Sequence, residues 1–209
     1  MKRIQSIIVS ILPSKLKIYI LRKLGFSIGN NSYIGFLAIL DCANITIGDN
    51  VYISGFNLIH RIQNFVVESY CKFDSFNWIT GGGTGSFSIH NNSAITRFHF
   101  FEASGNIEIG DNSIIAGRGS HFFTHGLAPH SLNDVRSIEI GPWCYIGSSS
   151  RFAPGTSIAK ATFVAMGSVV VKNFETSYIL IGGSPAKIIK NLSPKDKYFD
   201  RKYIFHSRN

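Results

Sequence analysis

The sequence predicts an all-β solenoid, a parallel β-helix of hexapeptide repeats, with an N-terminal helical segment before it and a short C-terminal tail after it. Three observations support this fold class. Large apolar residues recur every six positions, Gly-Asp-Asn triplets punctuate the pattern, and Gly and Phe are frequent while charged residues make up only 16% of the 209 residues. This composition is typical of a folded chain with many short strands. We divide the chain into residues 1–24 (helical segment), 25–190 (β-helix) and 191–209 (basic tail).

The six-residue repeat is clearest between residues 140 and 171. There a large apolar residue recurs six times, usually followed by a tiny one: Ile140-Gly141, Ile146-Gly147, Phe152-Ala153, Ile158-Ala159, Val164-Ala165 and Val170-Val171. A period of six matches neither a helix, at about 3.6, nor strand alternation, at about 2. It fits a coil with three flat faces that each place one apolar side chain inward, and stacked coils then form apolar ladders. The alternative is a β-sandwich with coincidental spacing, which six consecutive matches make improbable.

Turns and interruptions complete the repeat. The triplet Gly-Asp-Asn occurs at 48–50 and 110–112, and these residues tolerate the left-handed backbone that a corner requires. The rhythm breaks at 60–66, 80–88 and 126–137. Breaks in a solenoid are usually loops that leave one edge, and such loops often carry the functional site.

The first 24 residues begin like a signal peptide, because Met1-Lys2-Arg3 precedes an apolar stretch. No small-residue cleavage site follows, and Pro13 and Lys15 end the stretch, so we expect no signal peptide. The stretch is also shorter than the roughly 20 apolar residues of a membrane span. We expect a basic amphipathic helical segment, broken near Pro13. It either caps one end of the fold or lies on a membrane surface.

The net charge is +9, and much of it lies at the two ends of the chain. A basic surface suits an anionic ligand, nucleic acid or an acidic membrane, or serves solubility alone. No nucleic-acid-binding motif occurs, so we expect no nucleic-acid partner. The cysteines Cys42, Cys71 and Cys144 are far apart and lack metal-ligand spacing, which favours packed, reduced thiols in the cytoplasm.

Three motifs add a family resemblance to the repeat. These are "FFTHG" at 122–126 within the last break, "IEIGPWCYIG" where the repeat resumes, and "GGSPAK" at 182–187 where it ends. Together they resemble the hexapeptide-repeat acyltransferases, and within them the maltose, galactoside and surface-polysaccharide O-acetyltransferases. The resemblance covers about residues 25–190. It implies a left-handed β-helix, a homotrimer with active sites between subunits, and acetyl-CoA as the acyl donor.

By this resemblance, Thr124-His125 matches the catalytic position of the family, with His125 as general base. Histidine suits that role because its ordinary pKa, about 6.5, lies near operating pH. His121 and His130 are alternatives close by in the sequence. A carboxylate would orient the imidazole, with Glu102 and Asp134 as candidates. Backbone N–H groups would stabilise the oxyanion, so the chemistry requires no metal.

The same resemblance places the coenzyme groove beside the end of the repeat. Lys187 and Lys190 would contact the phosphates of acetyl-CoA, and Lys172 is a further candidate. Gly167 and Gly182 would let the pantetheine arm approach the backbone. The alternative for the lysines is an exposed, solubilising role.

Four residues are candidates for binding the acceptor. Trp78 and Asn77 lie in an aromatic and amide-rich stretch of the kind that binds sugar rings. His99 resembles a position where related polysaccharide acetyltransferases also carry histidine. Arg118 is either an acceptor contact or structural. For the aromatic residues and His99, core or interface packing is the alternative.

The sequence therefore predicts an acetyl-CoA-dependent O-acetyltransferase that acts on a sugar hydroxyl of a bacterial surface polysaccharide or its precursor. An N-acetyltransferase of an amino-sugar nucleotide would have the same fold and donor. A non-catalytic β-solenoid scaffold is the third hypothesis. We expect a cytoplasmic protein, and the basic N-terminal segment is consistent with membrane association.

Overall fold

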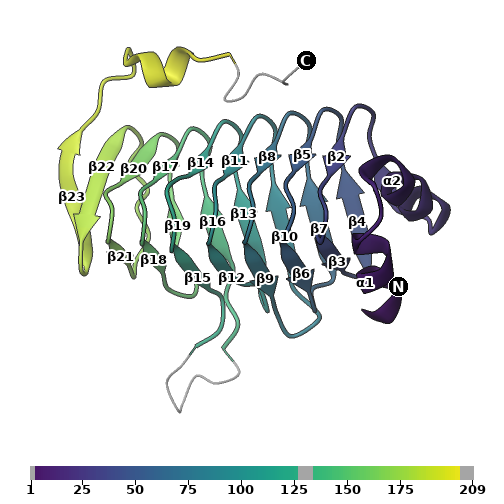
Figure 1. The fold of residues 1–209 in the computed structure, drawn as a ribbon. Coiled ribbons are helices and arrows are strands. Elements are labelled where there is room, and N and C mark those ends of the chain that lie inside the picture. The colour runs from purple at the N-terminus through teal and green to yellow at the C-terminus, as the bar shows by residue number, and fades with distance from the viewer. Residues whose placement is uncertain (1–2, 127–133, 203–209) are drawn as a thin grey trace.

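The chain is a left-handed parallel β-helix closed at both ends, as the computed structural model, which describes residues 3–126 and 134–202, shows (Figure 1). Its strands form three sheets, which we call A, B and C. Sheet A contains β1 (Ser27–Ile28), β4 (Asn44–Ile47), β7 (Asn64–Val67), β10 (Ser86–Ile89), β13 (Ile107–Ile109), β16 (Ile138–Ile140) and β19 (Ser157–Ile158). Sheet B contains β2 (Tyr33–Ile34), β5 (Tyr52–Ile53), β8 (Lys72–Phe73), β11 (Ala94–Ile95), β14 (Ile114–Ile115), β17 (Tyr145–Ile146), β20 (Thr162–Val164), β22 (Ile179–Gly183) and β23 (Ala186–Asn191). Sheet C contains β3 (Ile39–Asp41), β6 (Leu58–His60), β9 (Trp78–Thr80), β12 (Phe100–Glu102), β15 (His121–Phe123), β18 (Arg151–Phe152) and β21 (Val169–Val170).

Most coils are longer than three hexapeptides. Along sheet A, paired residues on neighbouring strands are 18 to 31 positions apart, and only the pairing of β16 with β19 has the spacing of 18. The breaks at 60–66 and 80–88 are therefore not loops that leave the solenoid, because β7 and β10 begin inside them. They are lengthened corners. The break at 126–137 does leave the solenoid, between β15 and β16 (Figure 1).

The core is the ladder of inward side chains that the repeat predicts. Aliphatic rows continue through the coils, and sheet C adds a column of phenylalanines. The ring centroids of Phe101 and Phe122 are 4.7 Å apart, and those of Phe122 and Phe152 are also 4.7 Å apart. This distance equals the usual spacing of hydrogen-bonded strands, so the rings of successive coils stack directly on one another.

The corner and cysteine predictions are confirmed. Asn50 and Asn112, the last residues of the two Gly-Asp-Asn triplets, have φ angles of 56° and 58°. Cys42, Cys71 and Cys144 are buried and free, and burial raises the pKa of each thiol to about 12. The thiols are therefore packing groups rather than nucleophiles.

Two helices cover the first coil. α1 (Arg3–Ser10) contacts β3, α2 (Ser14–Lys23) contacts β1 and β2, and Pro13 separates the helices. They lie at one end of the solenoid, away from the site of the long break (Figure 1). The cap that the sequence offered as one alternative is thus present.

The cap donates and accepts hydrogen bonds at the open edge of the first coil. The backbone N–H of Ile34 donates to Ser14 Oγ at 2.9 Å, and Lys17 Nζ donates to the carbonyl of Gly35. The Lys17 side chain is only 1% exposed, and burial lowers its pKa to about 8. These contacts provide hydrogen-bond partners for backbone N–H and C=O groups of the first coil, which a preceding coil would otherwise pair with.

The other end is closed by the antiparallel pair of β22 and β23, after which the chain turns back along sheet B. The short 3-10 helix η1 (Lys197–Asp200) packs on that sheet, where the Tyr198 and Phe163 ring centroids are 4.6 Å apart. The Tyr198 hydroxyl donates to the carbonyl of Cys144 at 3.2 Å. The described part of the tail is therefore packed on the solenoid.

Candidate active site

The long break forms a strand-like stem at the corner between sheets C and A. Residues His125 and Val135 form an antiparallel bridge, and the Gly126 N–H donates to the Asp134 carbonyl at 2.9 Å. The stem projects from the fifth coil (Figure 1). The predicted alternative base His130 lies outside the described residues.

His125 faces a carboxylate from the coil before it. Its Nδ1 atom lies 2.7 Å from Glu102 Oε2, although the approach is too bent for a good hydrogen bond. The His125 side chain is 33% exposed, whereas that of Glu102 is 10% exposed. A carboxylate at Nδ1 favours the tautomer that carries its proton there. The other ring nitrogen, Nε2, then has a free lone pair to accept a proton from a substrate.

Glu102 is held as an anion by several donors. Oε2 accepts from the Thr124 N–H at 3.1 Å and the Thr124 hydroxyl at 2.9 Å, while Oε1 accepts from the Ser104 N–H at 3.1 Å and from the Ser104 hydroxyl. Burial alone would raise the pKa of this carboxyl, but the hydrogen bonds from Ser104 and Thr124 and the close contact with the His125 imidazole outweigh it and lower the pKa. The site thus contains a fixed negative charge at neutral pH.

Of the two carboxylates considered from sequence, only Glu102 contacts His125 among the described residues. Asp134 instead pairs with Arg136 at 3.0 Å on the exposed stem. The sequence left this choice open, and the structure places Glu102 beside the histidine.

His99 lies in the interior rather than at a surface. It is 2% exposed, its Nδ1 accepts from the Ser120 N–H at 3.1 Å, and its Nε2 lies 3.0 Å from Thr96 Oγ1. Burial, with a smaller effect of the His121 charge, lowers its pKa to about 4. A neutral histidine with both nitrogens engaged fits a structural role, so we do not include His99 in the site.

Asn77 is also internal, whereas its neighbour Trp78 is exposed. Asn77 is 1% exposed and donates to the carbonyls of Asp74 and Thr96, each at 2.8 Å. Trp78 is 48% exposed, and its Nε1 donates to His60 Nε2 at 3.0 Å. Only Trp78 of this pair can therefore meet a ligand at the outer surface.

Trp78 begins a row of side chains on the outside of sheet C. Strand register aligns Trp78 with Phe100, Phe100 with His121, and His121 with Arg151. Burial first, and then the Arg151 charge, lower the pKa of His121. Glu102 lies on the neighbouring outward row of the same sheet, so this aromatic and basic row runs beside the histidine. Sequence reasoning missed Arg151, because the break puts 30 positions between it and His121.

The remaining predicted residues lie elsewhere in a single chain. Arg118 is exposed at the corner between sheets B and C, across sheet C from His125. Lys187 and Lys190 are exposed on β23, at the end of the solenoid. Gly167 turns an open corner with φ +71°, whereas Gly182 is buried.

Gly182 has a packing reason to be glycine. A Cβ atom there would lie 2.7 Å from Ile189 Cδ1 and 3.0 Å from Ala165 Cβ. Lys172 is exposed, with its Nζ 5.4 Å from the ring centroid of Phe174. These lysines and Gly167 are therefore all accessible, but they lie two or more coils beyond His125 in one chain.

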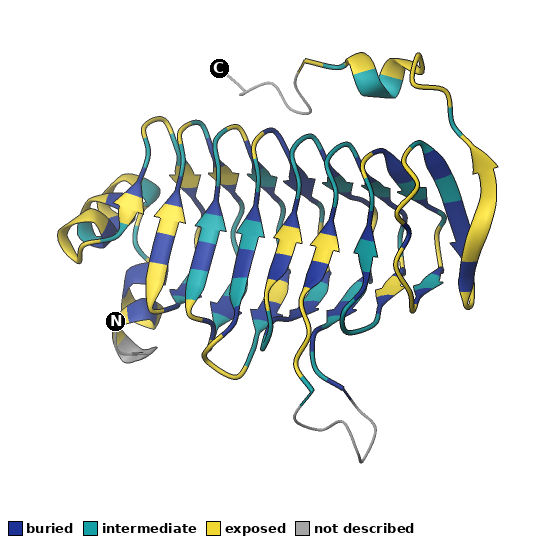
Figure 2. Ribbon diagram, turned by 180° about the vertical axis from the view of Figure 1, so that it is seen from behind, coloured by how far each residue is buried: buried dark blue, intermediate teal, exposed yellow. Residues whose placement is uncertain are grey.

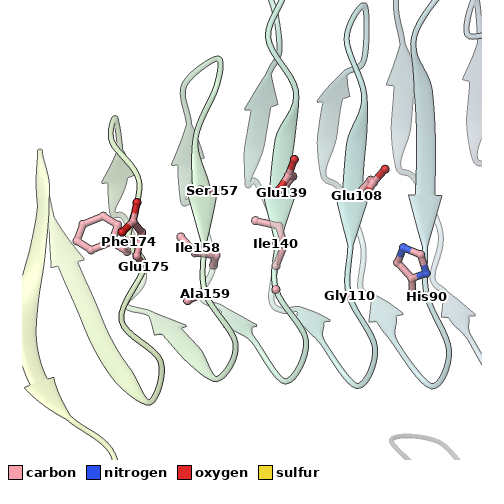
Figure 3. Close-up of a pocket in the computed structure, with 11 residues that line it drawn as sticks. His90, Glu108, Gly110, Glu139, Ile140, Ser157, Ile158, Ala159, Phe174 and Glu175 are labelled. Atoms are coloured by element: carbon pink, nitrogen blue, oxygen red, sulfur yellow. The ribbon is translucent and has the colours of Figure 1, made fainter.

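A separate hollow of about 350 Å³ lies on the outside of sheet A. Glu108, Glu139 and Glu175 line it, together with apolar atoms of Ile158 and Phe174 (Figure 3). None of the predicted site residues lines this hollow, and its carboxylates make it a poor place for phosphates. Among the described residues, no group of three His, Cys, Asp or Glu side chains is placed to hold a metal ion.

No protein-family model matches the chain. It is 27% identical over 136 residues to the Saccharomyces cerevisiae protein named "Putative acetyltransferase YJL218W". That match covers 64% of this chain, and it spans 66% of the yeast protein, slightly less than two thirds of its length.

Two solved structures are similar in fold. The polysialic acid O-acetyltransferase OatWY has a TM-score of 0.62 and 18% identity, covering 79% of this chain and 81% of its own. AntD, an N-acyltransferase from Bacillus cereus solved as a mutant with dTDP and coenzyme A, has a TM-score of 0.56 and 18% identity, covering 87% and 93%. At these identities the likeness establishes the fold. The resemblance seen in the sequence is confirmed at that level: the chain has the left-handed β-helix fold of the hexapeptide-repeat acyltransferases.

Proposed function

We propose that the chain is an acyltransferase that moves an acetyl group from acetyl-CoA to a hydroxyl of a surface polysaccharide or its precursor. The observation that carries this proposal is the contact of His125 with Glu102 at the stem of the long break. A partly exposed histidine whose second nitrogen faces a buried carboxylate is the arrangement that general base catalysis requires. The fold and the yeast relative support the same reaction class.

The proposed mechanism is a direct transfer. His125 Nε2 accepts the acceptor hydroxyl proton while that oxygen attacks the thioester carbonyl carbon, forming a C–O bond. The C–S bond then breaks, and His125 returns the proton to the leaving sulfur. Glu102 stabilises the imidazolium that exists between these two proton transfers. No atom of the enzyme forms a covalent bond, so buried thiols are no obstacle.

The donor would lie along the C-terminal coils. Lys187 and Lys190 are exposed cations that suit phosphate groups, and Gly167 offers an open backbone turn to an extended thioester arm. The surface fits the donor in charge and access. Coils are spaced by about 4.8 Å, so the turn at Gly167 and His125 differ by roughly 10 Å along the solenoid.

Calorimetry with acetyl-CoA tests the donor assignment. We expect saturable binding by the wild type that weakens with 3′-dephospho-CoA, and a loss of roughly tenfold for Lys187→Ala/Lys190→Ala. The control Lys195→Ala/Lys197→Ala removes the same charge from the tail and should bind normally. Equal affinity of all three proteins would contradict the lysine assignment, and an absence of binding would remove acetyl-CoA as the donor.

The acceptor would lie against the outer row of sheet C. Trp78 and Phe100 offer apolar surface to a sugar ring, and Arg151 supplies a cation to an anionic glycan. AntD, an N-acyltransferase with the same fold, gives the main alternative, transfer to the amine of a sugar nucleotide. Parallel assays with hydroxyl sugars and amino-sugar nucleotides would distinguish the two reactions.

We also propose a homotrimer with sites between subunits, supported by an exposed ridge at the corner of sheets B and C. This Phe ridge comprises Phe36, Phe56, Phe76 and Phe98, each 47–53% exposed. The rings of Phe76 and Phe98 stack at 4.9 Å, and those of Phe56 and Phe76 at 5.2 Å. Stacked rings present edges rather than faces, which suits packing against protein better than binding of sugar.

A further inference from the structure

The N-terminal cap departs from the usual amphipathic arrangement, although it also buries three apolar side chains, Val9, Ile18 and Leu21, against the core. Its buried side chains include polar ones, with Ser6, Ser10 and Lys17 only 1–2% exposed, whereas Ile8 and Tyr19 are 55% and 58% exposed. A surface helix of a globular protein normally turns its apolar stripe toward the core and its polar residues toward water. The first coil explains the inner face, because its open backbone edge binds polar groups of the cap. It does not explain the outer face.

Six large apolar side chains form this outer face. The exposed set, each 45–58% exposed, comprises Ile7, Ile8, Ile11, Leu16, Tyr19 and Leu24. They lie on α1, α2 and the adjoining turns, which cover the end of the solenoid and are largely exposed on the side away from it (Figure 2). We call this set, with the lysines between its members, the outer cap face.

The charged residues of the outer cap face are basic. Lys15 and Lys23 are exposed among the apolar residues, and Lys23 Nζ lies 5.7 Å from the centroid of the Tyr19 ring. The sequence has six Lys and Arg residues in positions 1–40 and no Asp or Glu there. A second copy of the chain docked on this face would bring like charges together, which disfavours self-association. An anionic surface complements both the charge and the exposed apolar side chains.

We propose that the outer cap face docks the protein on a membrane surface rich in anionic lipid headgroups. Ile7, Ile8 and Ile11 enter the boundary between headgroups and acyl chains, while Lys15 and Lys23 bind lipid phosphates. The mode is peripheral: among the described residues, no helix is long and apolar enough to cross a bilayer. Docking by the cap does not depend on the proposed reaction, because the cap lies about 20 Å, four coil steps, from the coil that bears His125.

Vesicle flotation tests this docking with the full chain. We expect the wild type to float with vesicles of phosphatidylcholine and phosphatidylglycerol, less so at high salt, and to remain behind with phosphatidylcholine alone. Ile7→Gln/Ile8→Gln/Ile11→Gln and Lys15→Glu/Lys23→Glu should each lower vesicle affinity roughly tenfold or more. Gln is a good helix former, so the first variant should keep the helices, which circular dichroism can verify.

Lys195→Glu/Lys197→Glu is the matched control, since it changes the net charge by the same amount at exposed positions of the tail. It should retain most of the vesicle binding. Equal losses in the control and the cap variants would overturn the proposal, because net charge alone would then explain the binding. Failure of the wild type to float with anionic vesicles would overturn it as well. So would a change of oligomeric state on sedimentation of the Gln variant, since the face would then be a contact between protein copies.

Discussion

Glu102 and His125 are 23 positions apart in the sequence but adjacent in space, because one coil separates them. The sequence predicts His125 from its motif and names Glu102 as one of two candidate partners. It cannot choose between them, because coil lengths vary from 18 to 31 residues along sheet A. The sequence therefore does not show which residues of neighbouring coils lie side by side. For His99 the sequence leaves two alternatives, an acceptor contact and a packed core histidine, and its burial favours the second. Its position near the site in sequence gives no sign that both its nitrogens are engaged inside the solenoid.

The role of Glu102 predicts a specific kinetic defect. Glu102→Gln should lower kcat about tenfold or more while leaving the KM for acetyl-CoA nearly unchanged, because a neutral amide cannot stabilise the imidazolium. Steady-state assays of thiol release would measure both constants. Glu139→Gln, a change at an exposed position of sheet A, is the control and should behave as wild type. A rise in KM without a fall in kcat would show that Glu102 acts in binding instead.

The lowered pKa of the buried His99 should make the stability of the protein depend on pH. Its pKa is lowered from 6.5 to about 4, so between these values the unfolded chain binds a proton that the folded chain does not. The contribution of His99 to the free energy of unfolding should therefore be almost fully present above pH 6.5, and it should decrease as the pH falls toward 4. Between about pH 7.5 and pH 5 the loss should be about 2 kcal/mol.

Denaturant unfolding at several pH values would measure this loss. His99→Gln should remove most of the dependence in this window while being less stable at neutral pH. Glu102 does not interfere, because its lowered pKa confines its contribution to pH values below about 4.5. His121 contributes in the same direction below about pH 6.5, because its pKa is also lowered, so a residual slope should remain in the variant. An unchanged pH slope in the variant would assign the effect to another group.

At the level of elements, the six-residue repeat predicts the inward ladders but not the lengths of the corners. Residues 60–66 and 80–88 do not follow the six-residue spacing because their coils contain extra corner residues, although β7 and β10 begin within these ranges. The corners also hold residues that local propensity would not choose. Phe56 and Phe76 have φ angles of 58° and 65°, a left-handed backbone that bulky side chains rarely adopt. A contact made by the Phe ridge would explain why such strain is kept.

Replacing two residues of the Phe ridge with Asn should weaken assembly of the trimer while relieving backbone strain at the corners. Phe56→Asn/Phe76→Asn should shift the protein from trimer toward monomer in sedimentation velocity, because the ridge loses its apolar contact surface. Asn tolerates left-handed backbone, so the variant monomer should fold normally by circular dichroism. Tyr70→Asn, at a left-handed corner outside the ridge, is the control and should leave the assembly intact. A Phe variant with unchanged sedimentation would rule the ridge out as the subunit contact.

At the level of the whole molecule, the sequence predicts a solenoid with a cap, a projecting break and a catalytic histidine, and the structure contains the solenoid, the cap and the break. Two features depend on contacts that no repeat encodes. The tail packs on sheet B through Tyr198, and the cap buries Lys17 against the first coil. The proposed donor surface, with Lys187, Lys190 and Gly167, also lies two or more coils from His125 in a single chain. The proposed trimer would bring the two together by placing the donor surface of one subunit beside His125 of another.

The role of His125 as general base is best tested by acetyl transfer from acetyl-CoA to a panel of sugar acceptors, comparing wild type with His125→Ala and His121→Ala. We expect turnover by the wild type and a fall in kcat of roughly 10²- to 10⁴-fold for His125→Ala, with donor binding retained. His121→Ala should keep most of the activity. Full activity of His125→Ala would contradict a role of His125 as general base, because the contact between His125 and Glu102 would then have no part in the chemistry.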